Sequence, residues 1–419
     1  MLSYKSLTAC RICGGSFSYQ SLELSPTGLA NELYLDQESA LNSERFPLEV
    51  VMCSKCKHFQ LKHIVDPERL FSEYVYKSGT SAFFQNHFEN LAEEIFKMFN
   101  DNSIKVFEVG SNDGLLLTAL GKIGIKAIGL EPSKSLVDEC NNNDLLVIHG
   151  FLTDEIVQSA TSQWGQFDVV VGNNVFAHID DLQEAFLNVY NLLSTDGIFI
   201  FEVADFAQIR KKGIFDSIYH EHMSYHTMTG LVELAKRTNF TIFDFVYINS
   251  HGGSFRFVLK KGSSRFRSRR IDEQLEQEQH EGLDSAEVLS EIAINIALKK
   301  KKVNGYLNFQ AKPLVYIGYG APAKAVTFIS EMGLQDIGIK GIIDDNKWKQ
   351  NKFLPVSGIQ INSKDDTIRS LVEPNQTSNF SFLIFPWNLG GDMLLNLKNW
   401  APSKSKVISF FPDLEVTVL

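Results

Sequence analysis

The sequence predicts an α/β protein made of a small four-cysteine module and two domains in which strands alternate with helices. Two cysteine pairs near the amino terminus indicate the module. A strand–helix alternation that begins at residue 104, and a second one that begins at Pro313, indicate the two domains. The chain has 419 residues, enough for two to four domains of roughly 100–200 residues each.

Composition and charge exclude several classes of protein. Hydrophobic residues make up 44% and charged residues 21% of the chain, as in ordinary globular proteins. The formal net charge is −10, so no global positive field would attract nucleic acid or an anionic membrane. The apolar stretches 313–318 and 382–387 are far shorter than the roughly 18–20 residues of a membrane span. The amino terminus lacks the apolar core of a signal peptide. We expect a cytoplasmic protein without a nucleic-acid or membrane partner.

The cysteines predict a metal site within residues 1–65. Four of the five fall in two Cys-x2-Cys pairs, with Cys140 left over, and this is the spacing of a tetrahedral zinc site. Two disulfides are disfavoured in a chain without an export signal. His58 and His63 lie near enough to replace a ligand, but a full set of cysteines makes them unnecessary. The predicted ligands of a structural Zn²⁺ are Cys10, Cys13, Cys53 and Cys56.

Residues 66–103 are predicted to be a helical connector, with Pro67 near a helix start and an apolar repeat through Phe84, Phe88 and Leu91. Strands are then expected at 105–110, 126–131, 145–150, 167–174 and 197–203, with helices from about 114 and 134 and near 181–193. This alternation is typical of a parallel sheet.

The end of this domain predicts an antiparallel hairpin. A helical stretch near 229–238 precedes the strand 240–248, the turn 249–253 and the strand 254–261. A seven-stranded sheet ending in a hairpin resembles the class I methyltransferase fold more than a six-stranded dinucleotide fold. We assign residues 104–262 to this Rossmann-like domain.

A linker and a second α/β domain follow. Residues 263–310 are charged and helical in period, and the run Arg265, Arg267, Arg269 and Arg270 is interpreted as part of a solvated interdomain element. Residues 311–419 contain the strands expected near 314–319, 339–343, 380–385 and 406–411. They predict a smaller Rossmann-like domain.

A glycine turn follows the first strand of residues 104–262 and opens a helix. Glycines at this edge of a parallel sheet permit close approach of a ligand to the backbone. Glu131 ends the second strand, where a carboxylate can accept both hydroxyls of a ribose. Asn173 and Asn174 end a further strand, where the methionine end of S-adenosylmethionine would lie. The predicted cofactor residues are Glu108, Gly110, Asn112, Asp113, Gly114, Glu131, Pro132, Ser133, Asn173 and Asn174.

The ribose contact alone does not distinguish S-adenosylmethionine from a nicotinamide cofactor. The predicted hairpin favours S-adenosylmethionine, and the absence of G-x-G-x-x-G at 108–114 disfavours the nicotinamide.

A dense group of titratable side chains follows the strand 197–203, on the cofactor side of the sheet. Such groups can transfer protons near neutral pH. A metal pair formed by His222 with His220 or His226, or an inert polar loop, remains open. The members are Tyr219, His220, Glu221, His222, Tyr225 and His226.

Seven motifs occur in a fixed order and together resemble the sugar C-methyltransferase family over essentially the full chain. They are the four-cysteine module, EVGSNDG (108–114), EPS (131–133), NNVFAH (173–178), YHEH (219–222), HGGSFR (251–256) and GYGAPAK (318–324). Members of that family methylate C-3 of a dTDP-linked 4-keto-deoxysugar.

The resemblance implies roles for the YHEH motif. His222 would remove the C-3 proton, Tyr219 and Glu221 would position this base or the keto group, and the enolate would attack the sulfonium methyl. His220 is the competing base. Tyr74 and Tyr76, in the segment 71–81, would line the sugar pocket, with Tyr76 close to the chemistry, unless both are packing residues.

The resemblance also implies a nucleotide site in residues 311–419. A glycine turn, a helix start and a lysine one turn later suit a diphosphate, although a purely structural turn remains open. Arg256 and His251 would face the same cleft, and Arg256 would pair with phosphate. The predicted substrate contacts are Tyr74, Tyr76, Tyr225, His251, Arg256, Gly318, Tyr319, Gly320 and Lys324.

The sequence therefore predicts an S-adenosylmethionine-dependent C-methyltransferase acting on a nucleotide-linked keto-deoxysugar. Alternatives within the same class are a GDP-linked substrate or methylation of oxygen or nitrogen. A noncatalytic nucleotide-sugar scaffold is the alternative of another class, which the clustered proton-transfer groups disfavour. We expect a monomer or a weak homodimer.

Overall fold

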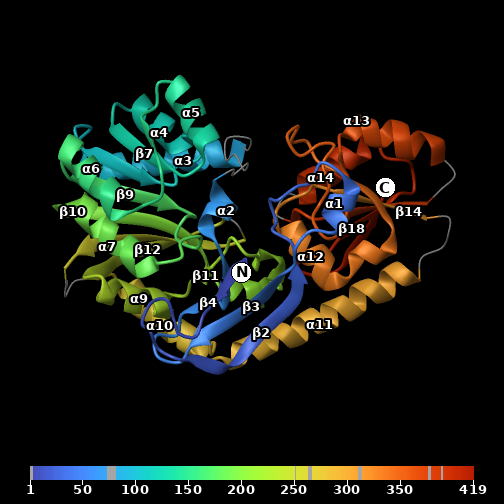
Figure 1. Ribbon diagram of the computed structural model, residues 1–419, viewed down its shortest axis with the longest axis horizontal. Coiled ribbons are helices and arrows are strands. Elements are labelled where there is room, and N and C mark those ends of the chain that lie inside the picture. Colours follow the sequence, from blue (N-terminus) through green and yellow to red (C-terminus); the bar gives the residue numbers. More distant parts are fainter. Residues whose placement is uncertain are drawn as a thin grey trace.

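The computed structural model describes residues 3–72, 82–250, 252–262, 267–309, 314–375, 379–387 and 390–419. Residues 82–262 form one lobe and residues 314–419 form the other (Figure 1). A sheet from the amino-terminal residues lies between the two lobes, and a long helix runs beneath it toward the carboxyl-terminal lobe.

The first lobe contains a seven-stranded sheet with the order β12-β13-β10-β9-β6-β7-β8. Strand β13 is antiparallel to β10 and to β12, whereas the other neighbours are parallel, so the predicted hairpin is confirmed. The strands are β6 (Lys105–Val109), β7 (Lys126–Glu131), β8 (Val147–His149), β9 (Phe167–Asn173), β10 (Leu193–Ala204), β12 (Phe240–Ile248) and β13 (Ser254–Lys261).

Helices cover both faces of this sheet because successive strand residues point to opposite sides. Val106 and Ile200 pack on one face with α3 (Ala82–Phe99) and α4 (Leu115–Lys122). Phe107 and Phe199 pack on the other face with α6 (Asp154–Trp164), α7 (Leu182–Leu192) and α9 (Met228–Arg237). The lobe also contains α5 (Lys134–Asn142). The loop after β10 carries α8 (Ala207–Lys212) and the short helix η2 (Phe215–Ser217), which pack outside this lobe against α11 (Glu287–Asn308) and α12 (Lys324–Met332).

The amino-terminal residues form a four-stranded sheet with the order β11-β4-β3-β2, and β1 pairs separately with β5. Strand β11 (Ser224–Tyr225) comes from the loop after β10 and pairs antiparallel with β4. From the sequence, this loop was assigned to the domain of residues 104–262; in the structure it also adds a strand to the amino-terminal sheet. The other elements are β1 (Tyr4–Ser6), β2 (Phe17–Thr27), α1 (Gln37–Leu41), β3 (Phe46–Cys53), β4 (Phe59–Leu61), β5 (His63–Val65) and α2 (Pro67–Phe71).

Two helices link the lobes, α10 (Arg269–His280) and α11 (Glu287–Asn308). The carboxyl-terminal lobe has a six-stranded sheet with the order β16-β15-β14-β17-β18-β19, parallel except for the last strand. Its elements are β14 (Leu314–Tyr319), α12 (Lys324–Met332), η3 (Leu334–Ile337), β15 (Ile339–Ile343), β16 (Ile361–Asn362), α13 (Lys364–Thr367), η4 (Ile368–Val372), η5 (Glu373–Asn375), β17 (Asn379–Ile384), α14 (Gly390–Lys398), β18 (Lys406–Ser409) and β19 (Glu415–Val418).

The amino-terminal sheet and the carboxyl-terminal lobe share one hydrophobic core. Phe46 and Phe59 belong to the same buried cluster as Phe328, Ile342 and Phe410. Helix α12 also contacts β2 and η2. The loop between β10 and α9 is therefore enclosed by all three parts of the chain.

Candidate active site and metal site

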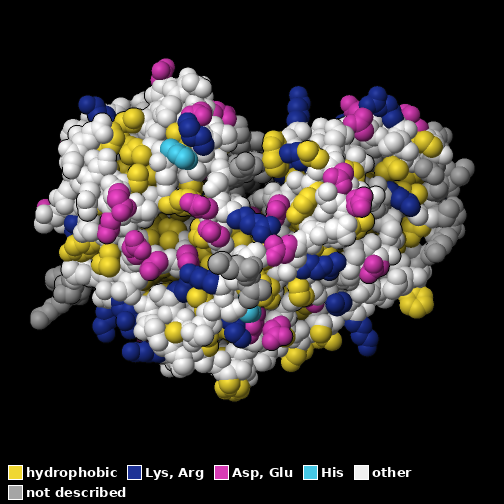
Figure 2. Space-filling view, in the orientation of Figure 1, with side chains coloured by type: hydrophobic (Ala, Val, Ile, Leu, Met, Phe, Trp, Pro, Cys, Tyr) yellow, Lys and Arg dark blue, Asp and Glu magenta, His cyan; other side chains and the backbone are white. Residues whose placement is uncertain are grey.

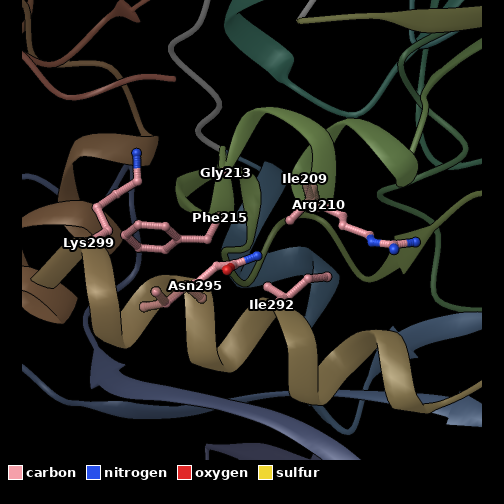
Figure 3. A pocket seen from close by; sticks show the side chains of 8 residues that line it. Ile209, Arg210, Gly213, Phe215, Ile292, Asn295 and Lys299 are labelled. Atoms are coloured by element: carbon pink, nitrogen blue, oxygen red, sulfur yellow. The ribbon is translucent and has the colours of Figure 1, made fainter. Parts of the chain in front are cut away.

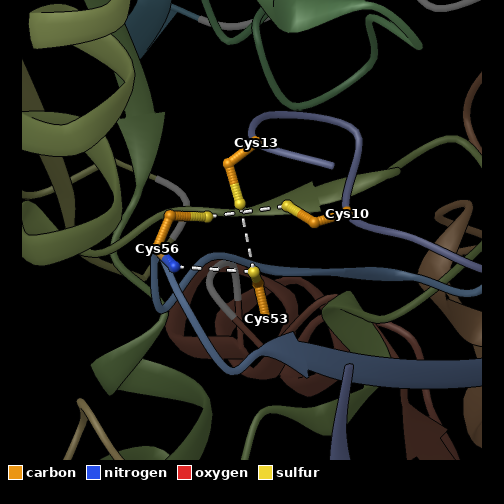
Figure 4. Close-up of side chains that lie close together, drawn as sticks. All are labelled: Cys10, Cys13, Cys53 and Cys56. Carbon is orange, nitrogen blue, oxygen red and sulfur yellow. Dashed lines mark hydrogen bonds between the residues drawn. The ribbon is translucent and has the colours of Figure 1, made fainter. Parts of the chain in front are cut away.

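The four cysteines predicted to bind zinc lie together. Cys10 and Cys13 come from one turn and Cys53 and Cys56 from another, and their sulfurs converge (Figure 4). All four sulfur atoms lie within 4.8 Å of one another, with Cys10–Cys56 at 3.5 Å and Cys13–Cys53 at 3.4 Å. Zinc–sulfur bonds of about 2.3 Å in a tetrahedron give sulfur separations of about 3.8 Å. The cluster fits a zinc ion, which would have no open coordination position.

Backbone amides support the thiolates. The amides of Ile12 and Gly15 donate to Cys10 Sγ and Cys13 Sγ, each at 3.4 Å, and the amide of Lys55 donates to Cys53 Sγ at 3.4 Å. These donors stabilise negative charge on sulfur, the form of cysteine that binds metal. In the described part of the chain no cysteine forms a disulfide.

The carboxyl ends of β6, β7 and β9 meet at one edge of the seven-stranded sheet, where the predicted cofactor residues lie. Glu131 is buried, and its two carboxylate oxygens accept from the amides of Asn112 and Ser133, both at 2.9 Å. Each oxygen keeps a second lone pair for a ribose hydroxyl. Gly110 and Asn112 have positive φ, as Gly114 does at the start of α4, and Pro132 follows Glu131.

Several polar atoms at this edge are buried without a hydrogen-bond partner in the described ranges. They are Glu108 Oε2, Ser111 Oγ and both side-chain polar atoms of Asn173. Burying such atoms unsatisfied costs free energy, so unpartnered groups indicate a missing ligand. Donors and acceptors at the ends of β6 and β9, beside a carboxylate suited to a ribose, fit S-adenosylmethionine.

The electrostatics of this edge also indicate a ligand site. Burial raises the pKa of Glu108 well above its usual range, and the nearby Asp113 and Glu131 add to the effect. Burial likewise raises the pKa of Glu131, although the two amide hydrogen bonds partly oppose the shift. Such perturbed carboxylates cluster at functional sites.

His222 is held in one tautomer by its neighbours. Its Nδ1 lies 2.8 Å from the Ser217 carbonyl, which can only accept, so Nδ1 carries the proton. Its Nε2 lies 2.9 Å from the Tyr219 hydroxyl and accepts from it. The ring of His178, from the NNVFAH motif, lies 4.9 Å from the His222 ring, edge to face. Nε2 of His222 is therefore the nitrogen available to take a proton.

Glu221 lies where the three parts of the chain meet. Asn31 Nδ2, from the amino-terminal module, donates to both carboxylate oxygens at 2.9 and 3.0 Å. Burial raises the pKa of Glu221 to about 8, although Asn31 and the charge of Lys349 in the carboxyl-terminal lobe oppose the shift. Glu221 is therefore mainly protonated at neutral pH.

His220 has different surroundings from His222. Its Nε2 donates to the Pro47 carbonyl at 3.3 Å, and its ring lies 5.6 Å from the Phe46 ring. Burial lowers the pKa of His220 to about 4, so the imidazole is a weak base. The neighbouring His226 is also buried, which lowers its pKa to about 4.

Two predicted substrate contacts have protein partners instead. Arg256 is buried, and its Nε donates to Glu202 at 2.6 Å while Nη1 donates to Glu94 at 2.5 Å. Arg256 is therefore paired with two carboxylates, and its contact with phosphate stays a prediction. Tyr225 is 5% exposed and packs 6.0 Å from Phe206, so its ring is part of a core and does not line an open pocket.

The glycine turn of the carboxyl-terminal lobe is also occupied by protein. The Gly320 amide donates to the Ile343 carbonyl at 2.7 Å, and the Ala321 amide to Asp344 Oδ2 at 2.8 Å. A Cβ on Gly320 would lie 2.4 Å from Pro386, and a Cβ on Gly318 would lie 2.7 Å from Ile342 and 2.8 Å from Phe385. The amides of Gly320 and Ala321 therefore have protein acceptors, and the diphosphate contact at this turn stays a prediction.

Lys324 and Tyr319 flank this turn. The ammonium of Lys324 lies 3.8 Å from the centre of the Trp387 ring, and its pKa is lowered to about 8 by burial, partly opposed by Asp216. Tyr319 is buried, which raises its pKa to about 12. Both groups serve the packing of this lobe.

A small cavity between α8 and α11 is too narrow for a substrate (Figure 3). Its volume is about 20 Å³, enough for about one water molecule. It is lined by Ile209, Arg210, Gly213, Phe215, Ile292, Asn295, Ile296 and Lys299.

Three side chains of this site were not predicted. His178 and Asn31 contact it, and Lys349 acts on Glu221 through its charge. His178 ends the quoted motif NNVFAH and could have been found there, whereas Asn31 and Lys349 carry no local signal. Tyr74, Tyr76 and His251 lie outside the described residues.

Comparisons with known protein families agree with this architecture. A "putative zinc binding domain" matches residues 10–71, a methyltransferase domain matches residues 83–244, and a C-methyltransferase C-terminal domain matches residues 249–412. The three matches follow one another along the chain, so the chain is similar to C-methyltransferases over most of its length. A curated relative, C-methyltransferase NovU of Streptomyces niveus, is 26% identical over 98% of this chain and 97% of its own length.

Solved structures resemble part of this C-methyltransferase. The PH0226 protein of Pyrococcus horikoshii is 17% identical over 46% of this chain and 97% of its own, with a TM-score of 0.37. Magnesium protoporphyrin IX methyltransferase of Synechocystis, with bound S-adenosylmethionine, is 14% identical over 43% of this chain and 79% of its own, with a TM-score of 0.33.

The C-methyltransferase uses S-adenosylmethionine as its methyl donor and carries a zinc module, as the sequence predicted. Among the described residues, no helix is long and apolar enough to cross a membrane.

Proposed function

We propose that this C-methyltransferase methylates the carbon next to the ketone of a nucleotide-linked 4-keto-deoxysugar, at C-3 of a dTDP-linked sugar, and that His222 is the base. The observation that carries the proposal is the fixed tautomer of His222. The Ser217 carbonyl holds the proton on Nδ1, so Nε2 presents a lone pair. A carbon acid beside a ketone requires such a base, together with a donor at the ketone oxygen.

Tyr219 is the proposed donor at the ketone oxygen. Its hydroxyl lies 2.9 Å from His222 Nε2, so one rotation of the C–O bond redirects its proton to a bound ketone. The same rotation frees Nε2 for the C-3 proton. A hydrogen bond to the developing enolate oxygen lowers the barrier to proton removal.

Glu221 supports this chemistry by being neutral. With a pKa of about 8 it carries little negative charge at pH 7, so it does not repel the enolate. S-adenosylmethionine, when bound, supplies the electrophilic methyl group. Glu131 would hold its ribose, and Asn173 would face its methionine end.

We propose the domain division given by the sequence: 1–65, 66–103, 104–262, 263–310 and 311–419. The surface is hollowed between the two lobes, with acidic and basic side chains along the hollow (Figure 2). The sugar would lie beside His222 and the nucleotide would extend along this hollow toward the carboxyl-terminal lobe. Lys349, which acts electrostatically on Glu221, would supply positive charge there.

The test is turnover followed by mass spectrometry and NMR. The enzyme is incubated with S-adenosylmethionine and freshly made dTDP-4-keto-2,6-dideoxyglucose. We expect S-adenosylhomocysteine and a sugar heavier by one methylene, with the new methyl at C-3. A methyl group on oxygen or nitrogen would contradict C-methylation of this sugar, and turnover only with a GDP-linked sugar would contradict the dTDP assignment.

His222→Ala tests the base. Without the methyl donor, the wild type should exchange the C-3 hydrogen for deuterium in heavy water. His222→Ala should bind S-adenosylmethionine normally but lose exchange and turnover by at least about 100-fold. His280→Ala changes an exposed histidine of α10 and is the matched control. Full activity of His222→Ala would remove His222 from the mechanism.

A further inference from the structure

Arg11 lies inside the first zinc knuckle, between Cys10 and Cys13, and its side chain is only 6% exposed. Every N–H group of its guanidinium has an acceptor. Nε donates to Gln60 Oε1 at 3.3 Å, Nη1 donates to the carbonyls of Ile179 (3.1 Å) and Asp180 (2.7 Å), and Nη2 donates to the Met223 carbonyl and to Ser224 Oγ (2.7 Å). A planar guanidinium with five satisfied donors holds these acceptors in one geometry.

Apart from Gln60 of β4, the acceptors belong to the two loops that carry the facing histidines of the site. Ile179 directly follows His178, and Met223 directly follows His222. The His178 and His222 rings lie 4.9 Å apart, and the Ser224 amide donates to the Ala177 carbonyl at 3.1 Å. Arg11 therefore links the two backbone segments that directly follow His178 and His222.

The second knuckle reaches the same loop. Strand β4 begins three residues after Cys56 and pairs with β11, which contains Ser224. The Leu61 amide donates to the Met223 carbonyl at 3.0 Å, and His58 Nε2 lies 3.2 Å from Ser224 Oγ. Met223 and Ser224 are thus held by Arg11 inside the first knuckle and by His58 and Leu61, which follow the second knuckle.

We propose that Arg11 is a positioning residue that transmits the geometry of the four-cysteine knuckle to the His178–His222 pair. In this proposal the amino-terminal module positions the loop that carries His222. The role of His222 in catalysis rests on the proposed function. The contact between the knuckle and the loop does not depend on it. Arg11 itself does not touch the substrate.

Lysine cannot replace arginine here. An ammonium group has three donors on one nitrogen, so it cannot reach acceptors on both loops at once, and buried carbonyls would lose their partners. Small displacements of catalytic groups reduce rates by about 100-fold. We expect Arg11→Lys to lower turnover and C-3 exchange by about that factor, with zinc content and S-adenosylmethionine affinity changed by less than about twofold.

The test compares Arg11→Lys with Arg269→Lys, which makes the same change at an exposed arginine of α10. Zinc content, cofactor affinity, exchange and turnover are measured for both. NMR of isotope-labelled histidine rings reports the tautomer and titration of His222 independently of activity. In Arg11→Lys the His222 signals should shift and the pH profile of His222 should change, while Arg269→Lys should match the wild type.

Unchanged His222 signals in zinc-loaded Arg11→Lys would overturn the inference, even if turnover fell. Shifted signals with normal turnover would support the inference and overturn His222 as the base. If Arg11→Lys loses zinc or fails to fold, Ser224→Ala replaces it, because that change removes a single acceptor of Arg11. Unaltered His222 signals and turnover in Ser224→Ala would then overturn the inference.

Discussion

At the scale of single residues, Glu221 shows how burial changes the chemistry of a side chain. It is 2% exposed, and among the described residues its side-chain hydrogen-bond donor is Asn31, from a distant part of the chain. Removing a carboxylate from water disfavours its charged form more than this donor favours it. The result is a carboxyl group that is mainly neutral at physiological pH.

Glu221→Gln should change how stability depends on pH. The pKa of Glu221 is raised to about 8 from 4.5, so its stabilising effect is complete below pH 4.5 and is lost as the pH rises to 8. The free energy of unfolding of the wild type should therefore fall relative to Glu221→Gln across this window, by at most about 1.4 kcal/mol per pH unit. Urea unfolding at several pH values measures the difference.

The control is Glu23→Gln, which changes an exposed glutamate of β2. Its stability should follow the wild type at every pH. A constant difference between the wild type and Glu221→Gln from pH 5 to 8 would mean that Glu221 is ionised throughout.

At the scale of elements, the turn after β6 depends on Gly110. Its φ is +68°, in the left-handed region, and a Cβ there would lie 2.4 Å from Val175 Cγ2. Side chains are disfavoured at such φ by about 1–2 kcal/mol, and the clash adds to this cost. The glycine brings β6 and the NNVFAH loop together at the cofactor edge.

Gly110→Ala should destabilise the protein by at least about 1–2 kcal/mol and weaken S-adenosylmethionine binding, because the turn must open to relieve the clash. Gly121→Ala is the matched control, since a Cβ at this exposed end of α4 meets nothing within 4 Å. Its stability should stay constant or rise by up to about 1 kcal/mol. Thermal unfolding and calorimetric titration measure both effects. Normal cofactor affinity in Gly110→Ala would show that the turn does not shape the site.

At the scale of the whole molecule, a buried carboxylate in the loop after β10 forms a hydrogen bond with the carboxyl-terminal lobe. Trp387 Nε1, in the carboxyl-terminal lobe, donates to Asp216 of η2 at 3.1 Å, and Lys324 lies over the Trp387 ring. Burial raises the pKa of Asp216 to about 6, although the charge of Lys324 and the Trp387 bond oppose the shift. Asp216 directly precedes Ser217, whose carbonyl orients His222.

Lys324→Met should destabilise this interface by roughly 1–3 kcal/mol, because it removes positive charge near a buried carboxylate while keeping apolar contact with Trp387. Adding Asp216→Asn should recover part of the loss. Chemical unfolding of the two single variants and the double variant measures the coupling. Unchanged stability together with weaker nucleotide-sugar binding would instead favour the phosphate contact predicted from the sequence.

Local signals predicted most of the fold. The seven strands, the hairpin and the helical linker were predicted from strand–helix alternation and from turn residues such as Gly252 and Gly253, both with positive φ, whereas the strand order came from the structure. The cysteine pairs gave the metal cluster because ligand spacing is a local property. Strand β11 was missed, because a two-residue strand depends on its partner β4 and has no periodicity of its own.

The sequence by itself determined which chemistry this C-methyltransferase contains: four thiolates, a carboxylate after the second strand and a cluster of proton-transfer groups, each encoded by neighbouring residues. Only the tertiary structure decided how those groups are used. Arg256 is neutralised by Glu202 and Glu94, Glu221 is neutral because three parts of the chain bury it, and Arg11 connects the knuckle to His222. Burial and hydrogen bonding between distant segments set protonation and position, and neither is a local property of sequence.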